Sequence, residues 1–187
     1  MTALDRQPAT PEIRPATPED AADIAAVHVS SFVATYPHLP STRSSAATGL
    51  AGRVVVWDRL LRDPGPNGIV LVATDEEGIR GFVRAGASPD DDAHGVGHIF
   101  SIHVSPELKR CGIGGRLMDR AVHFLGQAGF RSATLWVVSD NRPARAFYER
   151  LGWQAETLTR RQRLAVGDEQ GDDVEIVRYR RGLEDEE

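Results

Sequence analysis

The segment between His98 and Gly129 constrains the fold of this chain more than any other. It reads HIFSIHVSPELKRCGIGGRLMDRAVHFLGQAG. Residues 98–104 are apolar and β-branched, which predicts a buried strand that ends at Ser105 and Pro106. Beyond the glycines, apolar residues return at helical spacing, which predicts an amphipathic helix that Gly129 caps. These apolar residues are Ile113, Leu117, Ala121, Leu125 and Ala128.

Three glycines lie where this helix is expected to begin, at Gly112, Gly114 and Gly115. The first turn of a helix has N–H groups without internal partners at the positive end of the helix dipole. Glycines let a phosphate approach that backbone closely, and Lys109 and Arg110 add positive charge. The stretch therefore predicts a pyrophosphate site, although a plain turn between a strand and a helix would use the same residues.

Two familiar phosphate loops do not fit this stretch. In nucleoside-triphosphatases a Lys follows the last glycine and precedes Ser or Thr, whereas here Arg116 and Leu117 follow it. The dinucleotide fingerprint G-x-G-x-x-G would need its third glycine at position 117, which is Leu117. Neither class of nucleotide-binding protein is indicated.

The residues from Lys109 to Gly115, KRCGIGG, resemble the (Q/R)-x-x-G-x-(G/A) loop of the GCN5-related N-acetyltransferases (GNAT). Lys109 departs from the pattern but keeps its charge, without arginine's planar fork. A second signature of that family is similar to residues 134–153, TLWVVSDNRPARAFYERLGW. The two occur in the family's order, and the resemblance covers roughly residues 12–181.

The resemblance implies an α/β fold, a mixed, twisted central sheet of six to seven strands with helices on both faces and splayed central strands. We expect a flexible arm over residues 1–11, a single domain over 12–182 and an acidic tail over 183–187. Hydrophobic periodicity and turn residues predict the individual elements. Strands are expected at 12–15, 69–74, 79–86, 98–104, 133–138, 153–165 and 172–181, and helices from Thr17, at 46–62, from Gly112 and from Arg142.

The activity that the resemblance implies is direct transfer of an acetyl group from acetyl-coenzyme A to an amine of a small molecule or peptide. The coenzyme would be held by backbone amides of the central strand and of the glycine loop, and by Asn141. The expected coenzyme-binding residues are Ile102, His103, Val104, Lys109, Arg110, Cys111, Gly112, Ile113, Gly114, Gly115 and Asn141.

Two side chains are candidates for catalysis. Tyr148 follows Asn141 by seven residues, as the family's tyrosine does, and a phenol can donate a proton to the departing thiolate. His98 lies where many family members have a glutamate and could act as the base. Strict alternation along the strand predicts that His98 and His103 face opposite sides of the sheet. Each assignment competes with a packing or capping role.

The acceptor pocket has no readable signature. The resemblance suggests one wall from the first helices and their loop, with Phe32 and Tyr36, and also His38, as candidate contacts. Specificity is expected in the loops at 35–45, 88–97 and 166–171. The acidic run Asp90–Asp92 is typical of a solvated loop tip.

Composition limits the other possibilities. A net charge of −5 gives no indication of a nucleic-acid partner, and no apolar run approaches the ~20 residues that span a bilayer. One cysteine, Cys111, and no apolar leader favour the cytoplasm. We expect no metal, and a homodimer stays possible. The rival functions are a coenzyme A-binding regulatory module without turnover and a purely structural domain.

Overall fold

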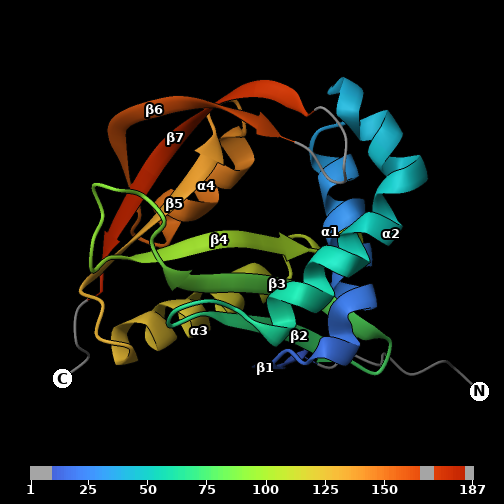
Figure 1. The fold of residues 1–187 in the computed structure, drawn as a ribbon, viewed down its shortest axis with the longest axis horizontal. Helices are drawn as coiled ribbons and strands as arrows, with labels where there is room; N and C mark the ends of the chain where they lie inside the picture. The colour runs from blue at the N-terminus through green and yellow to red at the C-terminus, as the bar shows by residue number, and fades with distance from the viewer. Residues whose placement is uncertain (1–9, 165–170, 184–187) are drawn as a thin grey trace, which may run out of the picture.

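One seven-stranded sheet runs through the molecule in the order β1-β2-β3-β4-β5-β7-β6 (Figure 1). The computed structural model describes residues 10–164 and 171–183, apart from the side chains of residues 43–48. The strands are β1 (Glu12–Pro15), β2 (Ile69–Asp75), β3 (Gly78–Ala87), β4 (Gly97–Val104), β5 (Ser132–Val138), β6 (Gln154–Leu164) and β7 (Asp172–Gly182). The helices are α1 (Ala21–Thr35), α2 (Pro40–Arg62), α3 (Ile113–Gln127) and α4 (Arg142–Arg150), with short 3-10 turns at Pro18–Asp20 and Pro106–Leu108.

Strand direction makes the sheet mixed, as expected. All neighbouring strands are antiparallel except β4 and β5, which are parallel. The parallel pair requires a long crossover, and α3 supplies it between the two strands. The expected mixed sheet with helices on both faces is confirmed.

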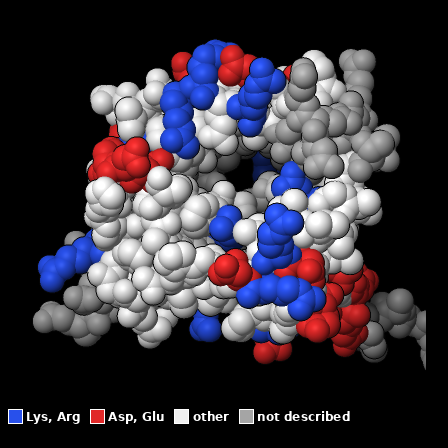
Figure 2. All heavy atoms as spheres, in the orientation of Figure 1, with Lys and Arg blue, Asp and Glu red and all other residues white. Residues whose placement is uncertain are grey.

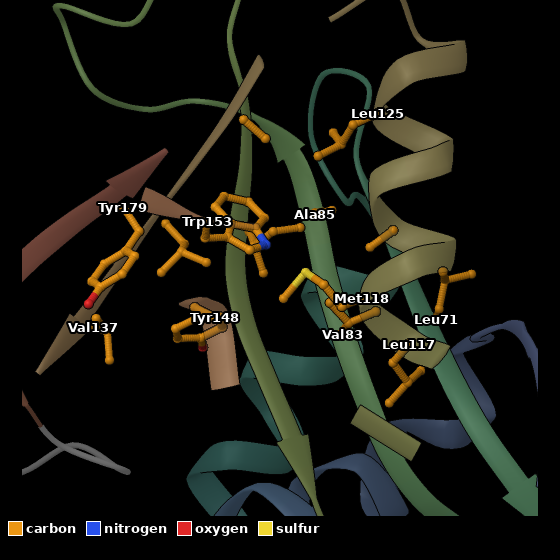
Figure 3. Packing of buried hydrophobic residues seen from close by; sticks show 14 of the residues in the cluster. Leu71, Val83, Ala85, Leu117, Met118, Leu125, Val137, Tyr148, Trp153 and Tyr179 are labelled. Carbon is orange, nitrogen blue, oxygen red and sulfur yellow. The ribbon is translucent and has the colours of Figure 1, made fainter. Parts of the chain in front are cut away.

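Two apolar clusters cover the two faces of the sheet. The larger lies between the sheet and α3 and α4, and Figure 3 shows Leu117, Met118 and Leu125 of α3 pointing at the strands. The smaller joins α1 and α2 to β2 and β3 around Trp57 and Phe82. In Figure 1, α1 and α2 lie side by side, whereas β5, β7 and β6 turn away from β4. The sheet is therefore well closed on its β1–β4 side and opens beyond β4.

The helix α3 forms as its periodicity predicts. Leu117, Ala121 and Leu125 are fully buried and lie four residues apart, on one face. Gly129 ends the helix with a φ of 88°, and the N–H of Phe130 donates to the carbonyl of Leu125. A left-handed glycine in this position satisfies carbonyls that the helix end leaves without partners.

Three features differ from the sequence-based expectations. The second helix begins at Pro40, six residues earlier than expected, because Pro is well tolerated in the first turn of a helix. A 3-10 turn precedes α1, where Asp20 accepts hydrogen bonds from Arg14 and from the N–H of Thr17. Leu183 is buried, and its N–H donates to the carbonyl of Arg131. Residues 1–9 of the expected arm over 1–11, the loop centre at 165–170 and residues 184–187 lie outside the described residues.

Substitution of Leu125 by Ala should lower the free energy of unfolding by about 2–5 kcal/mol, because it leaves a cavity in the larger core. The matched control is Leu50→Ala on α2, where the side chain is 47% exposed and the loss should stay within about 0.5 kcal/mol. Urea denaturation of both variants measures the difference. Equal losses would contradict the assigned core.

Candidate active site

The site is organised by the divergence of β4 from β5. The two strands pair only from Gly97 to Ile99 on β4 and from Ala133 to Leu135 on β5. From Phe100 onward β4 has no pairing to β5 among the described residues. Figure 2 shows the surface hollowed where β4 and β5 separate in Figure 1, with Lys or Arg atoms beside the opening. An unpaired strand edge next to a hollow can bond an extended ligand as an added strand would.

The glycine loop lies at the far end of β4. Arg110 and Gly112 have φ angles of 70° and 80°, and Gly112 is the residue that precedes α3. The first-turn amides of Ile113, Gly114 and Gly115 have no intrahelical partner by helix geometry. A Cβ added at Gly114 would contact Phe147 and Val104, whereas at Gly115 it would meet open space. The left-handed turn thus presents a row of N–H groups at a positive helix end, which suits a pyrophosphate.

Two cationic side chains at or beside this loop, Lys109 and Arg116, bind other parts of the chain. The Nζ of Lys109 donates to Thr35 Oγ1 at 3.4 Å, so it reaches towards the end of α1. Arg116 donates to the carbonyl of Pro11. Cys111 is exposed. Arg110 is exposed, so its side chain is available to a ligand together with the backbone of the loop.

The start of α4 brings three polar side chains together. Asn141 caps the helix by accepting from the N–H of Ala144, and its Nδ2 donates to the hydroxyl of Tyr36 at 2.9 Å. Tyr148 is buried, and burial together with the nearby Tyr36 raises the pKa of its phenol. Burial likewise raises the pKa of Tyr36. Both phenols stay protonated at neutral pH and can donate hydrogen bonds.

Phe32 packs against Tyr36. It is buried, and its ring lies 5.3 Å from that of Tyr36. Tyr36 in turn lies 6.4 Å from the ring of His38. Of the proposed acceptor contacts, Tyr36 reaches the α4 site, and Phe32 packs behind it.

A β-bulge changes the faces of β4, so the strict alternation expected there is wrong. Arg84 pairs with Ser101 but the next residue, Ala85, pairs with Ile99, which leaves Phe100 as an extra residue. The bulge shifts the phase by one residue, as bulges do. His98 and His103 therefore lie on the same face as Arg84 and Phe82 of β3, opposite α3.

His98 is buried and held at the paired end of β4. Its Nδ1 lies 2.9 Å from Thr134 Oγ1 on β5, and its ring contacts Phe100. Burial lowers the pKa of His98 to about 4, with Asp90 opposing the shift. The imidazole is neutral at pH 7, which leaves it able to accept a proton.

His103 belongs to a polar cluster that the sequence did not reveal. Its Nδ1 lies 2.6 Å from the hydroxyl of Ser31, and its ring stacks on Phe82 and touches His28. The indole N–H of Trp57 donates to His28 Nδ1. Burial lowers the pKa of His103 to about 4. Partners 72 residues apart carry no local signal, so no sequence pattern could have found this cluster.

The acidic run Asp90–Asp92 in the β3–β4 loop was expected to be a solvated tip, but the Asp90 side chain is buried. The side chain of Asp90 is 7% exposed and accepts from the indole N–H of Trp136 and from Arg160. Arg178 of β7 binds Asp92 through both terminal nitrogens and also pairs with Glu156. Asp90, Asp92 and Arg178 help to line a pocket of about 290 Å³ on the open half of the sheet. The loop is thus anchored to β5 and β7.

The described residues offer neither a metal site nor a membrane-spanning helix. They contain no group of three or more His, Cys, Asp or Glu side chains arranged to hold a metal ion. None of their helices combines the length and apolarity needed to cross a lipid bilayer.

A sheet that opens between parallel neighbours, with a glycine-rich helix start at the opening, defines the class of GNAT-fold acetyltransferases. The model of the acetyltransferase (GNAT) family matches residues 24–153. The uncharacterized N-acetyltransferase YuaI of Bacillus subtilis is 32% identical over 73% of this chain and 76% of its own length. This chain therefore belongs to the GNAT family of acetyl-coenzyme A-dependent N-acetyltransferases.

Other similar proteins share the domain or the fold. A mycothiol acetyltransferase of Nocardioides is 30% identical over 72% of this chain, but the match spans only 46% of that protein. A GCN5-related N-acetyltransferase structure from Rhodopseudomonas palustris has a TM-score of 0.69 at 24% identity and covers 95% of this chain and 99% of its own. The PaiA N-acetyltransferase of Thermoplasma acidophilum, in complex with coenzyme A, has a TM-score of 0.66 at 19% identity over 89% and 96% of the two chains.

Replacing Gly112 by Ala should lower the free energy of unfolding by roughly 1–2 kcal/mol, because an L-residue is strained at its φ of 80°. The same change at Gly115, which has open space around it inside the helix, should cost nothing or stabilise the protein slightly. Thermal or urea unfolding of the two variants measures the contrast. A cost at Gly115 and none at Gly112 would contradict the loop geometry.

The low pKa of His98 predicts a dependence of stability on pH. Between about pH 4 and pH 6.5 the unfolded chain binds a proton that the folded imidazole does not, so stability rises with pH in this window. The variant His98→Asn should therefore show a shallower slope, by up to about 1 kcal/mol per pH unit. Unfolding free energies measured across the window test this, and an unchanged slope would contradict it.

Proposed function

We propose that this chain transfers an acetyl group from acetyl-coenzyme A directly to an amine of a small molecule or a peptide. The observation that carries the proposal is the convergence of three elements at one opening. The glycine loop offers amides for the diphosphate, the unpaired edge of β4 can bond the pantetheine arm, and α4, which carries Tyr148, approaches the start of α3 through Phe147. Family membership supports the same reaction.

The coenzyme would lie along the separation of β4 and β5. Its diphosphate would bind the backbone from Lys109 to Gly115, with Asn141 on the α4 side. A backbone N–H between Ile102 and Val104 would donate to the carbonyl oxygen as it gains negative charge, which stabilises the tetrahedral intermediate.

Tyr148 would act as the acid. Its raised pKa keeps the phenol protonated, so it can donate to the sulfur as the thiolate leaves. His98 would act as the base, directly or through water, since its neutral imidazole can accept a proton from the acceptor amine. Phe32 and Tyr36 would form one wall of the acceptor site, with the Tyr36 hydroxyl close to α4.

The names of similar proteins do not agree on an acceptor. They include mycothiol acetyltransferases, a ribosomal-protein-alanine N-acetyltransferase from Brucella melitensis and a phosphinothricin acetyltransferase from Sinorhizobium meliloti. A small-molecule or peptide amine is the common class. We further propose a cytoplasmic protein, from its single cysteine, with a homodimer as a possible assembly.

A second function, coenzyme A binding without turnover, is favoured by one observation: His98 is 5% exposed and its lowered pKa makes it a weak base. Release of free thiol from acetyl-coenzyme A over a broad panel of amines separates the two functions. Amine-dependent release supports the transferase. Tight coenzyme binding without release on any amine would support the regulatory module instead.

Replacing Tyr148 by Phe should lower the turnover number at least about 100-fold, because the acid is lost while the ring remains. Coenzyme affinity should change little, since the coenzyme is proposed to bind through backbone amides. Steady-state kinetics and a thermal shift with coenzyme A measure the two effects. Unchanged turnover would exclude Tyr148 as the acid.

A further inference from the structure

Arg84 of β3 is a half-buried cation without an acidic partner among the described residues. Its Nε is shielded from solvent and makes no hydrogen bond. Burial alone lowers the pKa of its guanidinium, with no carboxylate opposing the shift. Arg116 and Arg145 donate to carbonyl or hydroxyl oxygens. Seven described arginines pair with carboxylates: Arg14, Arg62, Arg80, Arg160, Arg161, Arg178 and Arg180. An unpartnered donor in such a position calls for an explanation.

The contact that Arg84 does make leaves its donors unused. Its guanidinium lies over the ring of Phe100, 4.1 Å from the ring centre. Stacking of this kind occupies the flat face of the group, whereas the N–H bonds point outward in its plane. The edge of the guanidinium is the part that pairs with a carboxylate or a phosphonate through two parallel hydrogen bonds.

The position of Arg84 is central to the open face of the sheet. Along β3, Phe82 pairs with His103, Arg84 with Ser101 and Gly86 with His98. Because of the bulge at Phe100, both histidines lie on the same face as Arg84. The positive charge of Arg84 contributes to the lowered pKa of His98. Arg84 is therefore placed between the two histidines, beside the point where β4 leaves β5.

The nearby charges do not supply a partner. Asp90 lies near enough to His98 to raise its pKa. The Asp90 carboxylate, however, already pairs with Arg160 and Arg178 and accepts a hydrogen bond from the indole of Trp136. The diphosphate of the coenzyme would bind at the start of α3, which packs on the opposite face of the sheet. A ligand that meets Arg84 must come from the acceptor side.

We propose that Arg84 binds an oxyanion of the acceptor, so that the acceptors are amines that also carry a carboxylate or a phosphonate. The inference rests on the proposed acetyl transfer and narrows its substrate class. The acid group would lie against the edge of the Arg84 guanidinium, and the amine would extend from it towards the separation of β4 and β5. An amine without an anion would leave the guanidinium unpaired and bind less tightly.

The experiment uses matched acceptors and matched variants of the full chain. The acceptors are the common amino acids, their carboxamides and the corresponding aminophosphonates, each assayed for thiol release from acetyl-coenzyme A and titrated calorimetrically in the presence of coenzyme A. The variants are Arg84→Gln and Arg84→Lys, with Arg62→Gln on the exposed side of α2 as the control. Coenzyme affinity and circular dichroism check that each variant is folded.

We expect the wild type to favour an acid over its amide, and Arg84→Gln to raise the KM of the acid about 10- to 100-fold while that of the amide hardly changes. Arg84→Lys should fall between, since it keeps the charge without the fork. If transfer occurs but acids and amides are used equally well, the anion site is overturned and the proposed reaction is not. Weakened coenzyme binding in Arg84→Gln would also overturn the anion site. Arg84-dependent binding of acids without any transfer would uphold the anion site and overturn the proposed reaction.

Discussion

The early end of the hydrogen-bonded ladder between β4 and β5 is the constraint on which the rest of the structure depends. Three residue pairs join the strands, and beyond them the two halves of the sheet separate. A continuous sheet would have filled every donor of β4 and left no space for a ligand. The edge from Phe100 to Val104 is left unpaired towards β5, and the glycine loop follows where that edge ends.

Packing on both faces supports this separation. On one face, Phe147 of α4 lies close to Gly114 of α3, at van der Waals distance from where a Cβ on that glycine would be. On the other face, Ser31, His28 and Trp57 fix His103 at the free end of β4. On the far half of the sheet, Arg178 ties β7 to the β3–β4 loop. The contacts of Arg178 and the hydrogen bond from Asn141 to Tyr36 thus link the two halves, although β4 and β5 do not pair beyond Ile99.

The sequence predicted the parts of the site that depend on local chemistry. The glycines at the start of α3 and the cap at Asn141 follow from backbone rules that act within a few residues, and in the structure both lie at the N-terminal ends of their helices. The mixed sheet followed from resemblance together with strand patterning. The roles given to Tyr148 and His98 remain predictions, because geometry shows where they lie and what they contact.

The parts that could not be predicted depend on contacts distant in sequence. Strict alternation placed His98 and His103 on opposite faces, and a single extra residue at Phe100 reversed that result. Nothing in the pattern of β4 marks a bulge, since Phe suits a regular strand as well. The Asp90–Trp136 contact joins segments 46 residues apart, so the acidic run looked like a solvated tip. That Arg84 has no acidic partner in the described part of the chain is likewise visible only in the structure.

The most direct test of this account is a crystal structure of the protein soaked with acetyl-coenzyme A. The account predicts the diphosphate on the amides between Arg110 and Gly115, and the pantetheine arm in the separation between β4 and β5. A structure in which that separation is closed, or in which the coenzyme binds elsewhere, would contradict it.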